Sequence, residues 1–186
     1  MAAPKRLYFT EDDEANELIA RDPLALLIGF ALDQQVTVPT AFQGPLKLKQ
    51  RLGTLDARAI ADTDPAKLEE LFREKPAIHR FPGAMAQRVQ ELAAVIADDY
   101  GGDASRLWRE ARDGDDLRGR IAALPGFGEM KIKSLGAVLA NRFGVKKAEP
   151  LVPNHPTLGV VDSPEKLAEY QGWKREYKAK QRTAAR

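Results

Sequence analysis

Residues 124–131 read Leu-Pro-Gly-Phe-Gly-Glu-Met-Lys and lie between two segments with the apolar spacing of helices. The proline fixes a turn, while Gly126 and Gly128 permit backbone conformations with positive φ. Successive N–H groups at the start of the following helix form an anion site that suits a phosphate, and Lys131 and Lys133 add positive charge nearby. The stretch predicts a tight turn between two helices that binds a phosphate backbone; the alternative is an ordinary turn between packed helices.

Helical periodicity extends over most of the chain, and strand signals are poor. The apolar spacing, prolines and capping residues predict helices over residues 24–32, 66–73, 85–96, 115–123, 132–143 and 165–178. Residues 24–32 are apolar on every side, so we expect this helix in the centre of the fold. Residues 36–38 are too short for a convincing strand, and residues 146–161 are rich in proline and irregular. The predicted fold class is all-α.

Composition excludes several kinds of chemistry. The 186 residues contain 29 Lys and Arg, 27 Asp and Glu, and no Cys. Without Cys there are no disulfides, no thiolate catalysis and no Cys-held zinc or iron–sulfur cluster. A net charge of +2 is too small to identify a polyanionic partner, although it leaves room for a local basic groove. Residues 174–186 are strongly basic, which predicts a basic C-terminal helix that runs into a frayed tail.

No targeting or membrane signal is visible. The longest apolar run, residues 24–32, has nine residues, whereas a bilayer-spanning helix needs about 20. The N-terminal residues lack the apolar segment of a secretory signal. We therefore expect an intracellular protein, cytoplasmic and associated with the nucleoid, that is monomeric and has no membrane partner.

Three segments resemble the helix-hairpin-helix (HhH-GPD) superfamily of base-excision-repair DNA glycosylases. The Leu-Pro-Gly-Phe-Gly stretch resembles the hairpin of the family. Residues 22–37, which contain Asp-Gln-Gln-Val-Thr, are similar to its early buried helix, and residues 80–89 are similar to the helix before the hairpin. The order and separations also fit, over roughly residues 22–155. The chain resembles an endonuclease III-like, cluster-free and catalytically divergent member.

The resemblance implies a two-lobed all-α fold that binds double-stranded DNA in a cleft between the lobes. Residues 23–144 would form a barrel-like lobe ending in the hairpin, and residues 1–22 with 145–186 would form a terminal lobe, the two making one compact unit. Gly126, Phe127, Gly128, Lys131, Lys133, Gln34 and Gln35 would contact DNA. Gln35 matches the residue that fills the space left by a flipped base. Backbone carbonyls of Ala122, Leu124 and Phe127 would be placed to hold a monovalent cation, Na⁺ or K⁺, with no other cofactor.

The catalytic residues of the family are not found at their usual positions. A lyase lysine would stand at Met130, whose thioether cannot form a Schiff base, so lyase activity is disfavoured. The family carboxylate would stand at Pro153, in Leu-Val-Pro-Asn-His. Asp162 and Glu149 are the remaining carboxylate candidates, delivered by a different path of the loop. His155 as a base competes with the plainer interpretation of a hydrogen-bonded loop histidine.

Three functions therefore remain open. The first is a monofunctional DNA glycosylase that hydrolyses the N-glycosidic bond of a damaged base with water as the nucleophile. The second is a DNA-binding helix-hairpin-helix module that has lost the catalytic Asp and Lys. The third is a helical protein–protein adaptor, against which the lysines near the hairpin argue. Four aromatic residues, Trp108, Trp173, Tyr170 and Tyr177, are candidates for stacking on a flipped base, although buried aromatics are the commoner outcome.

Overall fold

The computed structural model describes residues 2–185, and within this range it is helical and contains no strand. The predicted all-α class is confirmed. Met1 and Arg186, the ends of the predicted terminal lobe, lie outside the described residues. The helices are α1 (Asp13–Arg21), α2 (Pro23–Leu32), α3 (Val38–Leu52), α4 (Ala57–Asp62), α5 (Pro65–Arg73), α6 (Pro82–Tyr100), α7 (Arg106–Arg109), α8 (Gly114–Ala122), α9 (Glu129–Phe143) and α10 (Pro164–Ala184), with 3₁₀ turns η1 (Lys146–Leu151) and η2 (Leu158–Val160).

Helix α2 forms the centre of the molecule, as its sequence predicts. Asp22 caps its N-terminus by accepting hydrogen bonds from the N–H groups of Leu24 and Ala25, and every residue after Pro23 is buried. A Cβ on Gly29 would come within 2.3 Å of the Phe42 ring, so α2 and α3 approach at a distance that only glycine permits. The core of the protein is therefore built around a helix without a polar face.

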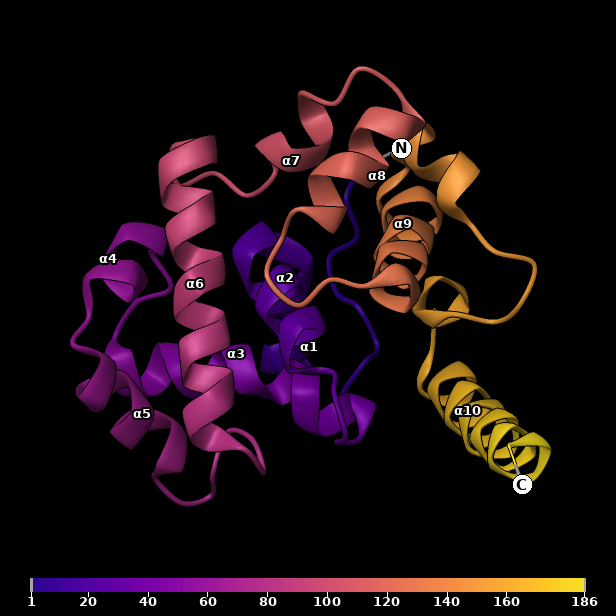
Figure 1. Cartoon of the computed structure of the whole chain (residues 1–186). Coiled ribbons are helices and arrows are strands. Elements are labelled where there is room, and N and C mark those ends of the chain that lie inside the picture. The colour runs from indigo at the N-terminus through magenta and orange to yellow at the C-terminus, as the bar shows by residue number, and fades with distance from the viewer. Residues whose placement is uncertain (1, 186) are drawn as a thin grey trace.

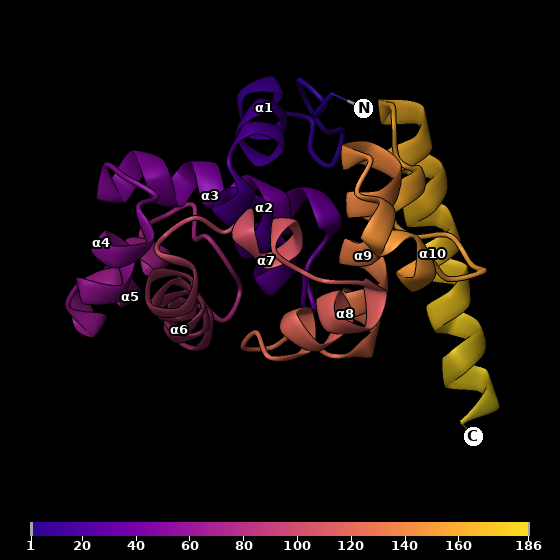
Figure 2. The ribbon, with the colours of Figure 1, turned by 90° about the horizontal axis from the view of Figure 1, so that it is seen from above.

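The helices pack in two groups on either side of α2 (Figure 1). On one side, α1, α3 and α6 contact α2, and the shorter α4 and α5 pack on α6. On the other side, α8 and α9 contact each other and η1, and α10 contacts η2. Both views place α9 between α2 and α10 (Figures 1 and 2). The predicted division into residues 23–144 and the two terminal parts stays a prediction.

Two helical features differ from the sequence expectations. The weak strand signal at residues 36–38 is instead the start of α3, where Thr37 caps the helix and Pro39 lies in its first turn. The C-terminal helix does not fray after residue 178 but continues to Ala184. Proline is tolerated in the first turn of a helix, which explains the start of α3. The exposed end of α10 contains mainly Lys, Arg, Gln and Ala, which have high helix propensity.

Among the described residues, no helix is both long enough and apolar enough to cross a lipid bilayer.

Candidate nucleic-acid interface

The hairpin lies where the sequence predicts it, between α8 and α9. The N–H of Phe127 donates to the carbonyl of Leu124 over 3.2 Å and closes the turn. Gly126 has φ +77°, and a Cβ there would lie 2.0 Å from a guanidinium nitrogen of Arg88, a residue of α6. Gly128 has φ −84° and open space around it, so of the two glycines only Gly126 uses the left-handed conformation.

The first turn of α9 keeps its backbone N–H groups free of side-chain caps. Gly128 is the N-cap residue, and no side chain accepts a hydrogen bond there. Glu129 follows, but Arg118 of α8 pairs with its carboxylate, and Lys133 lies 3.5 Å away. These cations offset the negative charge of Glu129, so the positive end of the helix dipole stays available to an anion.

The two predicted phosphate lysines have different surroundings. Lys133 is partly exposed beside Glu129. The amine of Lys131 instead turns inward and donates to the carbonyl of Ala31, at the end of α2, over 3.2 Å. Burial lowers the pKa of Lys131 to about 8, against a raising effect of nearby Asp33. Met130, at the position where the family resemblance places a lysine, is 59% exposed. The next residue, Lys131, is therefore the lysine whose amine is buried against the end of α2.

The predicted wedge residues lie in the turn after α2. Gln34 and Gln35 are both exposed, and Gln35 has φ +57°, the one non-glycine residue with positive φ between residues 2 and 185. The buried ring of His79 lies behind this turn and contacts the carbonyls of Leu32 and Gln34 at 3.1 and 3.0 Å. The backbone around the wedge is thus held in an unusual conformation by a histidine that sequence reasoning did not single out.

A basic groove of about 720 Å³ runs from this turn to α10. We define it by its lining residues, Glu11, Gln35, Val36, Thr37, Val38, Pro39, Arg80, Gln171, Lys174, Arg175, Lys178 and Arg182. Five of these side chains are cationic, and Glu11 alone is acidic. The groove therefore joins Gln35, the predicted wedge residue, to the basic C-terminal helix in a surface suited to a phosphate backbone.

Asp33 lies where the hairpin helix, the wedge turn and the basic groove meet. Its carboxylate is 14% exposed and faces the amine of Lys174 at 3.5 Å. The charge of Asp33 also acts on two neighbours. It opposes the lowering of the Lys131 pKa by burial, and it adds to burial, the larger cause, in raising the pKa of Tyr170. Sequence reasoning missed Asp33 because its partners come from α9 and α10, about 100 and 140 residues later in the chain.

The carboxylate candidates from the sequence lie elsewhere. Asp162 is exposed and lines a hollow with Asn141 and Arg142, at the C-terminal end of α9, whereas the hairpin is at the N-terminal end. Glu149 is exposed within η1. A 15-residue helix is about 22 Å long, so the structure does not bring Asp162 to the hairpin. The catalytic assignment of these two residues stays a prediction.

Three aromatic residues of α10 and one histidine of the preceding loop form a stack of rings. His155 stacks on Trp173 with 5.7 Å between ring centroids, and Trp173 stacks on Tyr170 and Tyr177 at 6.0 and 5.2 Å. The Nδ1 atom of His155 is 3.1 Å from the carbonyl oxygen of Pro156. Pro153, where the resemblance places the family carboxylate, belongs to the same loop and precedes His155 by two residues. Trp108 is 8% exposed and belongs to the core.

The carbonyls expected to hold a monovalent cation lie at the end of α8 and in the hairpin. The Leu124 carbonyl accepts from the N–H of Phe127, which leaves it a second lone pair. Ala122 is the last residue of α8, where carbonyls lack intrahelical donors. Oxygen donors of this kind suit a hard cation.

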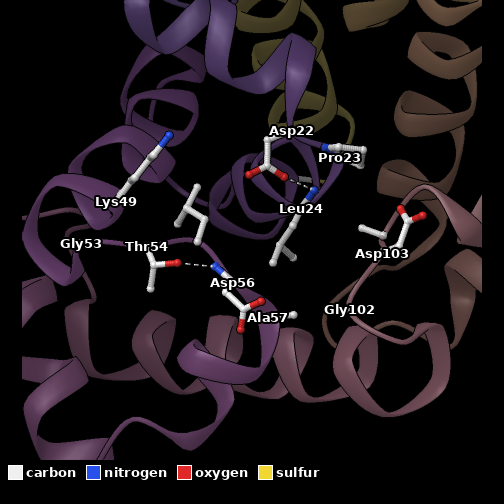
Figure 3. A pocket seen from close by; sticks show the side chains of 12 residues that line it. Asp22, Pro23, Leu24, Lys49, Gly53, Thr54, Asp56, Ala57, Gly102 and Asp103 are labelled. Atoms are coloured by element: carbon white, nitrogen blue, oxygen red, sulfur yellow. Dashed lines mark hydrogen bonds between the residues drawn. The ribbon is translucent and has the colours of Figure 1, made fainter.

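A second hollow, of about 410 Å³, has the opposite charge character (Figure 3). It lies at the N-terminal end of α2, and the carboxylates of Asp22, Asp56 and Asp103 line it together with the amine of Lys49. Figure 3 shows Asp22 turned toward Leu24, the start of the helix that it caps. The Gln34–Gln35 turn follows the other end of α2, so the molecule separates an acidic hollow from the basic groove.

One signal for the groove is present in the sequence. The cations at positions 174, 175, 178 and 182 have helical spacing of i, i+1, i+4 and i+8, which places them on one side of α10. No sequence signal identifies Arg88 of α6 as a neighbour of the hairpin, or Arg80, which precedes α6, as a neighbour of the groove, because both contacts depend on tertiary packing.

Comparison with known proteins agrees with this geometry. No curated protein and no solved structure matches the chain. Residues 28–179 match the family model of the HhH-GPD superfamily base excision DNA repair protein, a range that includes the second half of α2, the turn that follows it, the hairpin and most of α10. The chain belongs to the HhH-GPD superfamily of base-excision DNA repair proteins.

Proposed function

We propose that this protein binds double-stranded DNA and hydrolyses the N-glycosidic bond of a damaged base, as a monofunctional, endonuclease III-like glycosylase. The observation that carries the proposal is the basic groove, because Gln35 lies at one side of it and four cations of α10 at the other. A duplex in this groove would present its phosphates to α10 and its base stack to Gln35.

The hairpin supports the same binding mode from α9. Its uncapped helix start offers N–H groups to a phosphate, and Gly126 lets the turn pack tightly on Arg88. In this mode Gly128 and the backbone of Phe127 approach the strand, and Lys133 adds charge at its edge. The family membership implies DNA binding in base-excision repair, and the damaged base and the catalytic step are our proposal.

Cofactor requirements are small in this proposal. The chain has no cysteine that could hold an iron–sulfur cluster. A monovalent cation on the carbonyls of Ala122, Leu124 and Phe127 would neutralise negative charge beside a bound phosphate. The protein would act as a monomer, since one chain provides the groove, the wedge and the hairpin.

A second candidate is a DNA-binding protein without catalytic activity. It is favoured by Pro153 and Met130 at the positions where the family resemblance places the carboxylate and the lysine. This candidate has the same groove and hairpin, and it differs from the glycosylase only because it does not hydrolyse the N-glycosidic bond.

One experiment separates the two candidates. End-labelled duplexes containing single deaminated, alkylated or oxidised bases would be incubated with the protein, and alkali would then cleave every abasic site formed. Alkali-dependent cleavage of one duplex supports the glycosylase, whereas tight binding without cleavage of any duplex supports the non-catalytic protein. Failure to bind any duplex at low salt would contradict both.

Gln35 provides the matched variants. Asn and Gly both tolerate the positive φ at this position, so Gln35→Asn and Gln35→Gly keep the turn while only Asn keeps an amide. We expect Gln35→Gly to lose more affinity than Gln35→Asn for a duplex with an abasic site, measured by fluorescence anisotropy. Equal affinities for the two variants would argue against a wedge role of the side chain.

A further inference from the structure

Asp33 is held in surroundings that differ from those of Glu11, the one carboxylate that lines the groove. Glu11 is exposed, whereas the Asp33 side chain is 14% exposed and lies next to Lys174, one of the residues that line the groove. A carboxylate with little water around it exerts a stronger field on a nearby positive charge than one in bulk solvent. Asp33 is therefore a poorly solvated carboxylate in contact with a residue of the groove wall.

The contacts of Asp33 leave its oxygens available. Lys174 is 3.5 Å away, beyond the usual length of a charge-assisted hydrogen bond, and the amine of Lys131 donates to the Ala31 carbonyl instead. Both lysines lie near the carboxylate, and neither occupies it with a short bond. The third neighbour, Tyr170, is 8% exposed, and its ring lies 6.0 Å from the Lys174 amine.

The position of Asp33 in the chain also places it near the reaction. Asp33 is two residues before Gln35, so its carboxylate belongs to the same turn as the proposed wedge. Lys131 comes from the first turn of α9, directly after the hairpin, which ties the same point to the phosphate backbone. Gln35, Lys131 of the hairpin helix and Asp33 thus lie close together, and we call this place the junction.

We propose that Asp33 is the catalytic carboxylate of this protein, in place of the missing family aspartate, with Lys131 and Lys174 as residues that position it. In the proposed step, the bond from C1′ to the base breaks, and the base leaves with the electron pair and takes up a proton from solvent. Water adds to C1′, and Asp33 stabilises the positive charge that develops on the sugar and accepts the proton that the water loses. The inference rests on the proposed glycosylase function.

The test is a comparison of Asp33→Asn with the wild type on the duplex that the wild type cleaves. We expect the single-turnover rate of base release to fall by about 10²- to 10³-fold, the range found when a positioned electrostatic group is removed. Duplex affinity should stay equal or become tighter, because the substitution removes a negative charge next to the groove. Asp33→Glu, which keeps the charge but shifts it, should retain an intermediate rate.

Three rival variants make the result specific. Glu11→Gln, Glu149→Gln and Asp162→Asn would be assayed in parallel on the same duplex. Retention of the wild-type rate within about threefold in Asp33→Asn would overturn the assignment, as would a larger loss in any rival variant. Loss of duplex binding in Asp33→Asn would also overturn it, since the residue would then act on binding and not on the reaction.

A readout independent of activity tests the junction itself. In protein with ¹³C-labelled lysine side chains, the Lys131 signal is identified by its absence in Lys131→Arg and then titrated by NMR. Because Asp33 raises the pKa of Lys131, Asp33→Asn should lower that pKa, and an unchanged titration would contradict the proposed juxtaposition. If the wild type cleaves no duplex, the proposed glycosylase function fails, whereas wild-type cleavage with an active Asp33→Asn variant removes only the role of Asp33.

Discussion

The imidazole of His79 and the backbone carbonyl of Gln34 are joined by a hydrogen bond of 3.0 Å, and the same nitrogen, Nε2, lies 3.1 Å from the carbonyl of Leu32. The other ring nitrogen, Nδ1, accepts from the N–H of Phe81 over 3.0 Å. This pattern assigns the hydrogen to Nε2, because carbonyls only accept and a backbone N–H only donates. A neutral histidine therefore holds the turn that carries the wedge.

Replacement of His79 should destabilise the protein. His79→Leu leaves the Gln34 carbonyl and the Phe81 N–H without their partner, while the Leu32 carbonyl keeps the N–H of Gln34. We therefore expect the free energy of unfolding in urea to fall by about 1–3 kcal/mol. His155→Leu is the matched control, because that ring lies in a partly exposed loop, and it should cost less.

The same contact predicts a dependence on pH. Burial lowers the pKa of His79 below that of an unfolded chain. The unfolded state then takes up the proton first, so the contribution of His79 is complete above the unfolded pKa, about 6.5, and is lost as the pH falls toward the folded value. If His79→Leu loses the same stability at pH 5 and pH 8, the assigned neutral tautomer is wrong.

The two hairpin glycines should respond differently to alanine. At Gly126 a Cβ meets Arg88 at 2.0 Å and the backbone has φ +77°, whereas at Gly128 the space is open and φ is −84°. Gly126→Ala should lower the free energy of unfolding by about 1–2 kcal/mol from the left-handed backbone alone, with the contact to Arg88 adding to it. Gly128→Ala should be nearly neutral in thermal unfolding, and equal losses for the two variants would contradict the hairpin geometry.

The basic groove should determine the salt dependence of DNA binding. Replacing Lys178 and Arg182 with Gln removes two cations from the groove wall, so the slope of log K against log salt should become less steep by about 0.9 for each lost phosphate contact. Lys166→Gln, on the same helix but paired with Glu169 outside the groove, is the control and should keep the wild-type slope. An unchanged slope in the double variant would place the DNA elsewhere.

Lys131 should make stability increase with pH in the alkaline range. Its pKa of about 8 in the folded protein lies below the ordinary value of 10.5, mainly because of burial. Between these values the unfolded state binds more protons, so unfolding becomes less favourable as the pH rises. Relative to Lys131→Met, the wild type should gain stability from pH 8 to about 10.5 in urea titrations and show a constant difference below pH 8. A difference that stays constant across the whole range would show that the amine is not buried.

Local patterns in the sequence determined most of the elements. Asp22 before Pro23 and an unbroken apolar run specify a buried helix, and Gly144 ends α9 with a left-handed C-cap, because capping and periodicity depend on neighbours a few residues away. The hairpin is local in the same sense, which is why its position followed from eight residues.

The site required the tertiary structure. Three residues of the site come from different parts of the chain: Asp33 directly follows α2, Lys131 lies in α9 and Lys174 lies in α10. They meet only when these helices pack side by side, and no spacing in the sequence records that meeting. His79 and Arg88 likewise act on turns about 40 residues away. The sequence by itself determined the helices, the hairpin turn and the family resemblance, while the packing of α9 and α10 beside α2 decided which carboxylate and which lysine lie near Gln35.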